Sequence, residues 1–175
     1  MTKIDIDRTS VEQILNETTK TATTYLGVPL STLNTKIRGD VLQNFARYID
    51  GKLLEGEIMD ARKDGSPTQE FDYQRGSTRV EVKSGQLCWN KGSKKWFVKF
   101  RDIKPNLYDE LCLVLYTPKG LYIFKHNSSG LTTNGKLTEV KGLYLNYSAP
   151  PMLEWQNALD NIIQQIGSIF YYWSF

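Results

Sequence analysis

The residues that bind zinc and form disulfides are scarce in this sequence. It contains two cysteines, Cys88 and Cys112, and a single histidine, His126. Neither cysteine has a second cysteine or a histidine at the spacing of zinc ligands, which argues against a zinc site. Isolated cysteines are typical of reduced proteins, so we expect an intracellular, cytoplasmic protein.

Long apolar runs are also missing. The first ten residues, MTKIDIDRTS, hold no apolar segment of the kind found in a signal peptide. No apolar run elsewhere reaches the length that spans a bilayer, so we expect no membrane partner. The sequence also shows no internal repeat and no linker-like stretch.

The composition that remains is that of an ordinary globular protein, with 40% hydrophobic and 23% charged residues. A chain of 175 residues can bury a core without disulfide or metal staples. We therefore predict one domain over 1–175, with helices in 1–56, a sheet core in 57–126, and a loop, strand and closing helix in 127–175. The net charge of +3 permits a nucleic-acid partner but does not argue for one, since many unrelated proteins are mildly basic.

Two helices are predicted near the N-terminus. The first begins at the capping pair Thr9 and Glu12, and its helical spacing continues to Tyr25. The second begins near Ser31 and carries an apolar stripe as far as Leu53. The residues of that stripe are Ile37, Val41, Leu42, Phe45, Ala46, Ile49 and Leu53.

Beyond Gly56 the apolar period changes to two, which predicts strands. The candidate strands are 57–61, 70–74, 78–84, 86–89, 96–100, 110–116, 121–126 and 140–147. The stretch 111–115 is apolar at every position, which indicates a central strand covered on both faces. A closing helix is expected after Pro151, with an apolar face that extends to Phe170. This order predicts an α/β three-layer sandwich, with a central mixed β-sheet flanked by helices.

Asp72, Glu81 and Lys83 form the candidate site. A turn at 75–77 allows the segment around Asp72 to pair with the next strand as an antiparallel hairpin. The register of that hairpin can bring Asp72 beside Glu81. Because Glu81 and Lys83 are two residues apart, they point to the same face of their strand. We therefore expect two carboxylates and one ammonium to converge.

Such a set of charges has a definite chemistry. Mg²⁺ prefers carboxylate oxygens, waters and a substrate phosphate, and Asp72, Glu81 and the Val82 carbonyl could provide the protein's share. Lys83 would then lie beside the activated water and stabilise charge that develops on the phosphate. The arrangement predicts a metal-dependent centre that hydrolyses phosphodiester bonds.

A plainer interpretation of the same charges stays open. Glu-x-Lys is common on solvated strand edges, and Asp72 could be a turn residue. The apolar neighbours Phe71, Val80 and Val82, together with the apolar stretch 111–115, favour a position inside the sheet instead. Charges in such a position need a partner or a function.

The pattern Asp72…Glu81-Val82-Lys83 resembles the PD-(D/E)XK nuclease superfamily, which includes most type II restriction endonucleases. The resemblance implies a restriction-endonuclease-like fold, with Asp72 and Glu81 as metal ligands and Lys83 as the catalytic lysine. It runs from about Lys36 to His126. The segments that carry it are 36–40, 81–84 with Trp89, 96–100, 103–105 and 108–111.

The sequence departs from that superfamily at two positions. Phe71 stands where the superfamily name has proline. Many relatives also place a glutamate on the preceding helix, and here Asp40 and Gln43 are the candidates for this third contact. Asp40 is equally readable as a residue of the helix surface, so the third contact stays open.

Four lysines are candidates for contact with the nucleic-acid backbone. Lys91, Lys94 and Lys95 lie in a basic turn between two tryptophans, and Lys104 follows soon after. Lysines beside a metal site would bind phosphates and set the register of a duplex. A solvated hairpin turn between two core tryptophans is the alternative.

The polar loop after His126 is the candidate for reading bases. Asn134 and Lys136 carry groups that can hydrogen-bond to base edges in the major groove. A hydrophilic loop that closes a hairpin is an equally good interpretation. His126 is expected to be structural or to face DNA, since one histidine without a suitable motif does not build a histidine-based nuclease centre.

The resemblance implies a Mg²⁺-dependent DNA endonuclease of the site-specific, type II restriction-like kind, with Mn²⁺ able to substitute. It is expected to cut double-stranded DNA, to leave 5′-phosphate ends, and to act as a homodimer or higher homo-oligomer through its C-terminal helix and the aromatic residues 170–175. A homing endonuclease, a repair nuclease and a junction nuclease share the same core and stay open. A catalytically idle nucleic-acid-binding module and a structural protein with a solvated hairpin also stay open.

Overall fold

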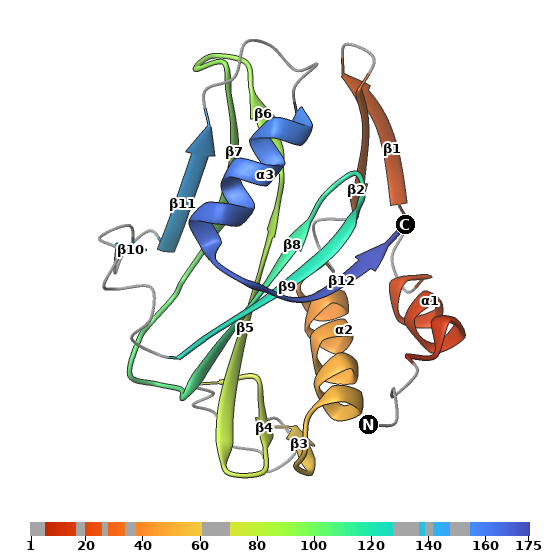
Figure 1. Cartoon of the computed structure of the whole chain (residues 1–175), viewed down its shortest axis with the longest axis vertical. Coiled ribbons are helices and arrows are strands. Elements are labelled where there is room, and N and C mark those ends of the chain that lie inside the picture. Colours follow the sequence, from red (N-terminus) through yellow and green to blue (C-terminus); the bar gives the residue numbers. More distant parts are fainter. Residues whose placement is uncertain are drawn as a thin grey trace.

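A six-stranded mixed sheet is the centre of the computed structural model, which describes residues 6–16, 20–25, 28–33, 38–60, 71–127, 137–138, 142–147 and 155–175 (Figure 1). The strand order is β12, β9, β8, β5, β4 and β3. β5 and β8 are parallel neighbours, and every other neighbouring pair in this sheet is antiparallel. The bounds in sheet order are Ile169–Ser174, Gly120–Asn127, Glu110–Tyr116, Thr78–Gln86, Tyr73–Arg75 and Ile58–Asp60. The predicted α/β class, with a central mixed sheet flanked by helices, is confirmed.

α2 (Arg38–Leu53) covers one face of this sheet, and α1 (Arg8–Asn16) packs beside α2 (Figure 1). The buried residues of α2 recur three and four positions apart, which is the pattern of a helix with one apolar face. They are Val41, Leu42, Phe45, Ala46 and Ile49. The predicted stripe is confirmed over this range, but the helix begins at Arg38 and not near Ser31. Ile37 lies outside the described residues.

α1 is capped by Asp7 and not, as predicted, by Thr9. The Asp7 Oδ1 accepts the Thr9 backbone N–H at 3.1 Å, and its Oδ2 accepts the Ser10 hydroxyl at 2.6 Å. The bond to Thr9 satisfies a backbone N–H that the first turn of a helix leaves without a partner. The hydrogen bond from Ser10 also holds the pKa of Asp7 below its ordinary value.

The prediction that the first helix continues to Tyr25 is wrong. The helix ends at Asn16, and β1 (Lys20–Tyr25) pairs with β2 (Val28–Leu33) as an antiparallel two-stranded sheet. β1 carries three threonines, whose branched side chains favour an extended backbone. Pro29, in β2, cannot donate a hydrogen bond inside a helix. Backbone preference therefore overrode the helical spacing of the apolar residues.

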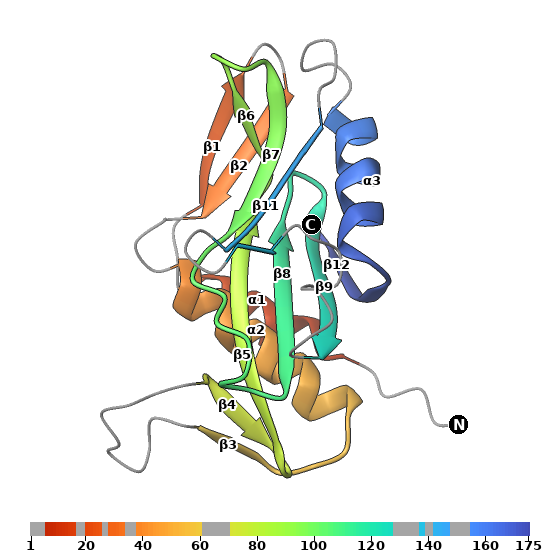
Figure 2. The ribbon, with the colours of Figure 1, turned by 90° about the vertical axis from the view of Figure 1, so that its left-hand side faces the viewer.

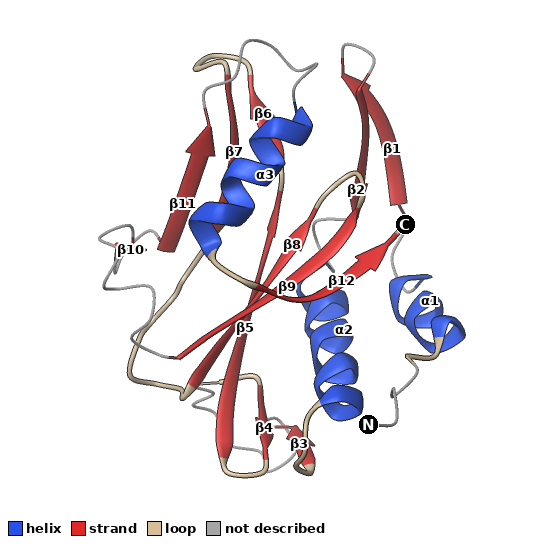
Figure 3. Cartoon of the chain, viewed as in Figure 1, coloured by secondary structure: helices blue, strands red, loops and turns tan. Residues whose placement is uncertain are grey.

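A second, four-stranded sheet packs against the opposite face of the central sheet. Its order is β10 (Leu137–Thr138), β11 (Gly142–Tyr147), β7 (Lys95–Phe100) and β6 (Cys88–Asn90). α3 (Trp155–Ile166) contacts this second sheet, away from α1 and α2 (Figure 3). Each of the eight candidate strands overlaps an observed strand, with bounds that agree within about three residues. The described helices include none that is long and apolar enough to cross a membrane.

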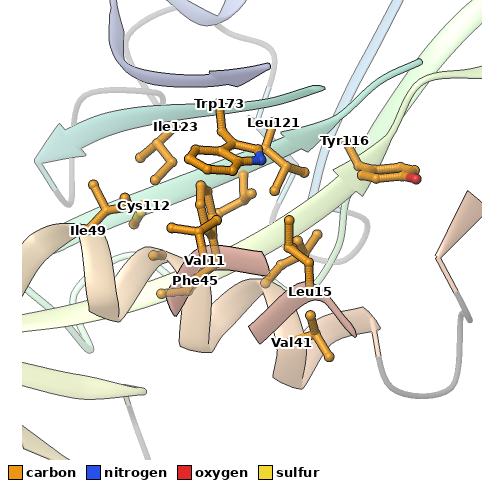
Figure 4. Packing of buried hydrophobic residues seen from close by; sticks show 14 of the residues in the cluster. Val11, Leu15, Val41, Phe45, Ile49, Cys112, Tyr116, Leu121, Ile123 and Trp173 are labelled. Atoms are coloured by element: carbon orange, nitrogen blue, oxygen red, sulfur yellow. The ribbon is translucent and has the colours of Figure 1, made fainter. Parts of the chain in front are cut away.

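β8 is buried on both faces, as the sequence predicted. Its residues from Leu111 to Tyr116 are at most 2% exposed. Alternate side chains enter two separate cores, because successive residues of a strand point to opposite faces. Leu111, Leu113 and Leu115 pack on the side of α3 and β7. Cys112, Val114 and Tyr116 pack on the side of α1 and α2 (Figure 4).

Gly85 is the point where β7 passes over β5. A Cβ atom at this position would lie 2.7 Å from a methyl carbon of Val98 and 3.0 Å from the Lys99 carbonyl oxygen. Any larger residue would therefore push the second sheet away from the first. β6 and β7 extend toward the end of the molecule where β1 and β2 lie, and β3 and β4 lie at the other end (Figure 2).

The C-terminal helix ends before Phe170, which corrects the prediction. α3 ends at Ile166, and Gly167 (φ 133°) leads into β12, which pairs antiparallel with β9. The aromatic residues of β12 favour a strand. The Tyr172 ring stacks on Tyr122 with ring centroids 4.5 Å apart, and Trp173 enters the core beside α1. The aromatic end is thus an edge strand of the main sheet.

Four charges from separate elements meet beneath α2. Asp50 of α2 is fully buried, and Arg75 Nη1 lies 2.9 Å from its Oδ2. Lys125 Nζ lies 2.7 Å from Asp50 Oδ1 and 2.6 Å from Glu110 Oε1, while Arg75 Nη2 lies 3.0 Å from Glu110 Oε2. The Tyr73 hydroxyl also donates to Asp50. Two cations and two anions balance, so this buried charge cluster ties α2 to β4, β8 and β9.

Asp50→Ala is expected to destabilise the protein by about 3–5 kcal/mol, because Arg75 and Lys125 would share one remaining carboxylate inside the protein. Urea unfolding followed by circular dichroism measures the loss. Glu12→Ala, which removes the exposed ion pair with Arg8, is the control and should cost less than about 1 kcal/mol. Equal losses in the two variants would contradict the anchoring role of the cluster.

Candidate active site

The structure brings Asp72, Glu81 and Lys83 together at the hairpin of β4 and β5. Asp72 comes directly before β4, and its backbone N–H donates to the Val80 carbonyl at 2.9 Å. Tyr73 is paired with Val80, so the antiparallel register places Asp72 beside Glu81.

Next to this point, the Asp72 side chain, in place of a backbone carbonyl, accepts a hydrogen bond from β5. Its Oδ2 accepts the backbone N–H of Val82 at 2.8 Å. The N–H and C=O of one strand residue point to the same edge, so the Val82 carbonyl also faces the Asp72 side of β5. The Asp72 carboxylate and the Val82 carbonyl therefore lie at the same edge of β5, next to Glu81.

Glu81 and Lys83 lie on the sheet face opposite α2. Lys83 Nζ is 2.5 Å from Glu81 Oε1. The Lys83 side chain is 22% exposed and the Glu81 side chain is 13% exposed. Val80 and Val82 point to the other face and pack in the core with α1 and α2. The charges are therefore not on an open, solvated strand edge.

The electrostatics of this acid pair disfavour two negative charges. Burial, and after it the neighbouring Asp72 carboxylate, raise the pKa of Glu81 to about 7, although Lys83 opposes the shift. One ammonium thus leaves the carboxylate pair short of positive charge at neutral pH. A bound cation would supply that charge.

Tyr108 is a member of the site that the sequence did not indicate. Its side chain is 3% exposed, and among the described residues its hydroxyl has no hydrogen-bond partner. Burial, together with the charge of Glu81, raises the pKa of Tyr108 to about 12, so the hydroxyl stays protonated as a donor. Its place two residues before β8, the strand parallel to β5, was the available signal.

Asp40 and Gln43 are placed on α2, which packs on the face that Glu81 and Lys83 turn away from. Asp40 is exposed in the first turn of α2, where the partial positive charge of the helix N-terminus stabilises a carboxylate. Gln43 is half-buried. Across the described ranges, no group of three or more histidine, cysteine, aspartate and glutamate side chains could hold a metal ion. The third contact stays a prediction.

The predicted nucleic-acid contacts are only partly described. Lys91 and Lys94 are exposed in the turn between β6 and β7, Lys95 opens β7, and Lys104 is exposed. The flanking tryptophan rings pack at a tilt, with centroids 5.4 Å apart and an interplanar angle of 59°, and Trp96 is fully buried in the core, as its strand position predicted. Asn134 and Lys136 lie outside the described residues.

His126 lies on β9 and is half-buried. Burial lowers its pKa, and a backbone hydrogen bond with Ile166 opposes that effect. A Cβ atom at Gly167 would lie 3.2 Å from the imidazole. These contacts fit the structural role that was one of its two predicted interpretations.

No protein-family model matches the sequence, and no curated protein matches it either. Among solved structures, the chain is similar to a bacterial homing endonuclease, I-Ssp6803I, with a TM-score of 0.37 and 14% sequence identity. The match covers 74% of this chain and 96% of that one. Similarity at this level assigns neither family nor function, so the chemistry of the site has to do so.

Glu81→Gln is expected to stabilise the metal-free protein above neutral pH. Folding raises the pKa of Glu81 from 4.5 to about 7, so in that window the native protein holds a proton that the unfolded chain has lost. Wild-type stability therefore falls as pH rises through the window, and the glutamine variant avoids the fall. The expected advantage near pH 8 is about 1–3 kcal/mol.

Urea unfolding below and above the window, in the presence of a chelator, measures this effect. Glu12→Gln, at an exposed position, is the control and should follow the wild-type curve. Parallel stability curves for the wild type and Glu81→Gln would show that Glu81 does not titrate as described.

Proposed function

We propose that the protein is a Mg²⁺-dependent DNA endonuclease that hydrolyses phosphodiester bonds. The observation that carries the proposal is the position of Asp72 beside Glu81, with Lys83 Nζ 2.5 Å from Glu81 Oε1. The three groups are partly buried and come from one hairpin. That combination suits a metal and an attacking water better than it suits a solvated strand.

The donor set fits Mg²⁺. This ion keeps several waters and is bound by one or two carboxylates plus substrate phosphates. Asp72 and Glu81 supply two carboxylates, and the Val82 carbonyl faces the same side. The raised pKa of Glu81 in the metal-free protein supports a site that is completed by a cation.

Asp72 and Glu81, with the Val82 carbonyl, would hold the metal. Mg²⁺ in that position would lower the pKa of a water and offset negative charge on the phosphate. Lys83 donates hydrogen bonds that align the attacking water with the scissile phosphate, and the Tyr108 hydroxyl offers a further donor. The water oxygen forms the new bond to phosphorus, the bond to the sugar 3′-oxygen breaks, and that oxygen takes up a proton. The product ends are a 5′-phosphate and a 3′-hydroxyl.

Within this class we favour a site-specific, type II restriction-like enzyme that acts on double-stranded DNA as a homodimer, with Mn²⁺ able to replace Mg²⁺. The sequence resemblance and the exposed lysines of the turn between β6 and β7 support this choice. Homing, repair and junction nucleases are alternatives, which differ in whether a short symmetric site, a long asymmetric site, or a lesion or branch is cut. An idle DNA-binding module is favoured only by the two-carboxylate donor set, which lacks a third acid among the described residues.

Asp72→Asn and Lys83→Met are each expected to lower Mg²⁺-dependent cleavage of a supercoiled plasmid at least about 100-fold. Asparagine retains an oxygen that can accept the Val82 N–H, so the hairpin should stay folded. Asp60→Asn is the matched control, because Asp60 belongs to the neighbouring strand and pairs with Arg47 at 3.4 Å. Gel analysis of nicked and linear products over time gives the rates, and sequencing of the ends gives the cut position.

Wild-type cleavage by Asp72→Asn would remove Asp72 from the site. Duplex binding without cleavage by the wild-type protein, in either Mg²⁺ or Mn²⁺, would favour the idle binding module.

A further inference from the structure

Two arginines stand apart from the others in the part of the chain that the structure describes. Arg8, Arg47, Arg75 and Arg79 each pair with a carboxylate at 2.9–3.4 Å. Within the same described residues, Arg38 and Arg101 have no carboxylate partner. Arg101 also lies close enough to Arg38 for the two charges to repel each other.

The partner of Arg38 is a neutral amide. Arg38 is the first residue of α2 and is half-buried, and its Nη1 donates to Oε1 of Gln86 at 3.3 Å. Burial lowers the pKa of Arg38, and the nearby Arg101 charge lowers it too, although Cys88 opposes the effect. A half-buried guanidinium with an amide on one side and a second cation nearby is electrostatically incomplete.

The crossing of the two sheets explains why these residues meet. Gln86 is the last residue of β5 and follows Gly85, over which β7 passes. The Lys99 carbonyl and the Phe100 ring both approach the Gly85 position to 3.0 Å. Arg101 follows Phe100 directly, so it leaves β7 beside the end of β5. The pair is therefore built from α2, β5 and β7.

We propose that Arg38 and Arg101 form a subsite for a backbone phosphate of nucleic acid. Guanidinium groups bind phosphate oxygens in a fork, and the N-terminus of α2 adds a partial positive charge at Arg38. Gln86 lies three residues from Lys83 along β5, a distance of about 10 Å. That distance corresponds to about three nucleotides of axial rise in a duplex strand. Because Gln86 is an odd number of residues from Lys83, its side chain points to the α2 face of β5, so the subsite lies around the end of β5 from Lys83.

The identity of the ligand rests on the proposed nuclease function, but the test is made without cleavage. Fluorescence anisotropy of a labelled duplex in a chelator, over a range of salt concentrations, gives the affinity and its salt dependence. Arg38→Gln and Arg101→Gln are each expected to weaken binding and to reduce the slope of log K against log salt by about 1. Arg38→Lys keeps the charge and should keep most of the slope.

Arg47→Gln is the matched control, since Arg47 lies on the same helix and is already paired with Asp60. It should leave the slope unchanged. Thermal unfolding of each variant checks that the fold is retained. A wild-type slope for Arg38→Gln, or an equal loss in Arg47→Gln, overturns the subsite.

Cys88 provides a second, local readout. It is half-buried within electrostatic range of Arg38, whereas Cys112 is fully buried and should not react in the native protein. Bound duplex is expected to slow alkylation of Cys88, and inorganic phosphate at the same ionic strength is expected to slow it far less. Unchanged alkylation with bound duplex, or equal protection by phosphate, overturns a nucleic-acid backbone as the ligand.

The two proposals fail separately. A protein that binds duplex through Arg38 and never cuts it keeps the phosphate subsite and loses the nuclease function. A protein that cuts DNA while Arg38→Gln and Arg101→Gln bind with the wild-type slope keeps the nuclease function and loses the subsite.

Discussion

The register between β4 and β5 is the constraint on which the site depends. Tyr73 opposite Val80 sets Asp72 beside Glu81, and the Val82 N–H locks the Asp72 carboxylate in that place. A slip by one residue would turn Glu81 and Lys83 toward the apolar core beneath α2 and move the valines to the other face. The buried charge cluster opposes such a slip, because Arg75 and the Tyr73 hydroxyl, both from β4, are held by Asp50 of α2. Helix, hairpin and site are thus fixed together.

The two faces of the sheet have different roles in this arrangement. The face toward α1 and α2 is a continuous core that includes Val80, Val82 and the even residues of β8. The opposite face is covered by α3 and the second sheet. β7 crosses β5 at Gly85, two residues beyond Lys83. The acid pair lies on one side of this crossing, and Arg38 with Arg101 lies on the other. The charged site is therefore carried by a well-packed scaffold.

The sequence predicted those parts of the fold that depend on local pattern. β8 was evident from five consecutive apolar residues, α2 from its stripe, and the convergence of Asp72, Glu81 and Lys83 from a short hairpin with a defined turn. The segments of β1 and β12 were assigned to helices, because the spacing of apolar residues over a short segment fits both the helical period and the strand period. In both segments threonine or aromatic content, together with a partner strand, decided the outcome. Arg38 and Arg101 could not be predicted, since packing between elements far apart in the sequence brings them together, and the one signal for Tyr108 was its place shortly before β8.

The most direct test of the account is to locate the metal. Crystals soaked in Mn²⁺ and measured near the manganese absorption edge would give an anomalous map that identifies the ion without assumption about its ligands. We expect a peak between the carboxylates of Asp72 and Glu81, on the side of the Val82 carbonyl, and its loss in Asp72→Asn. Fully occupied Mn²⁺ elsewhere in the protein, with Asp72 and Glu81 making no contact to it, would contradict the central claim.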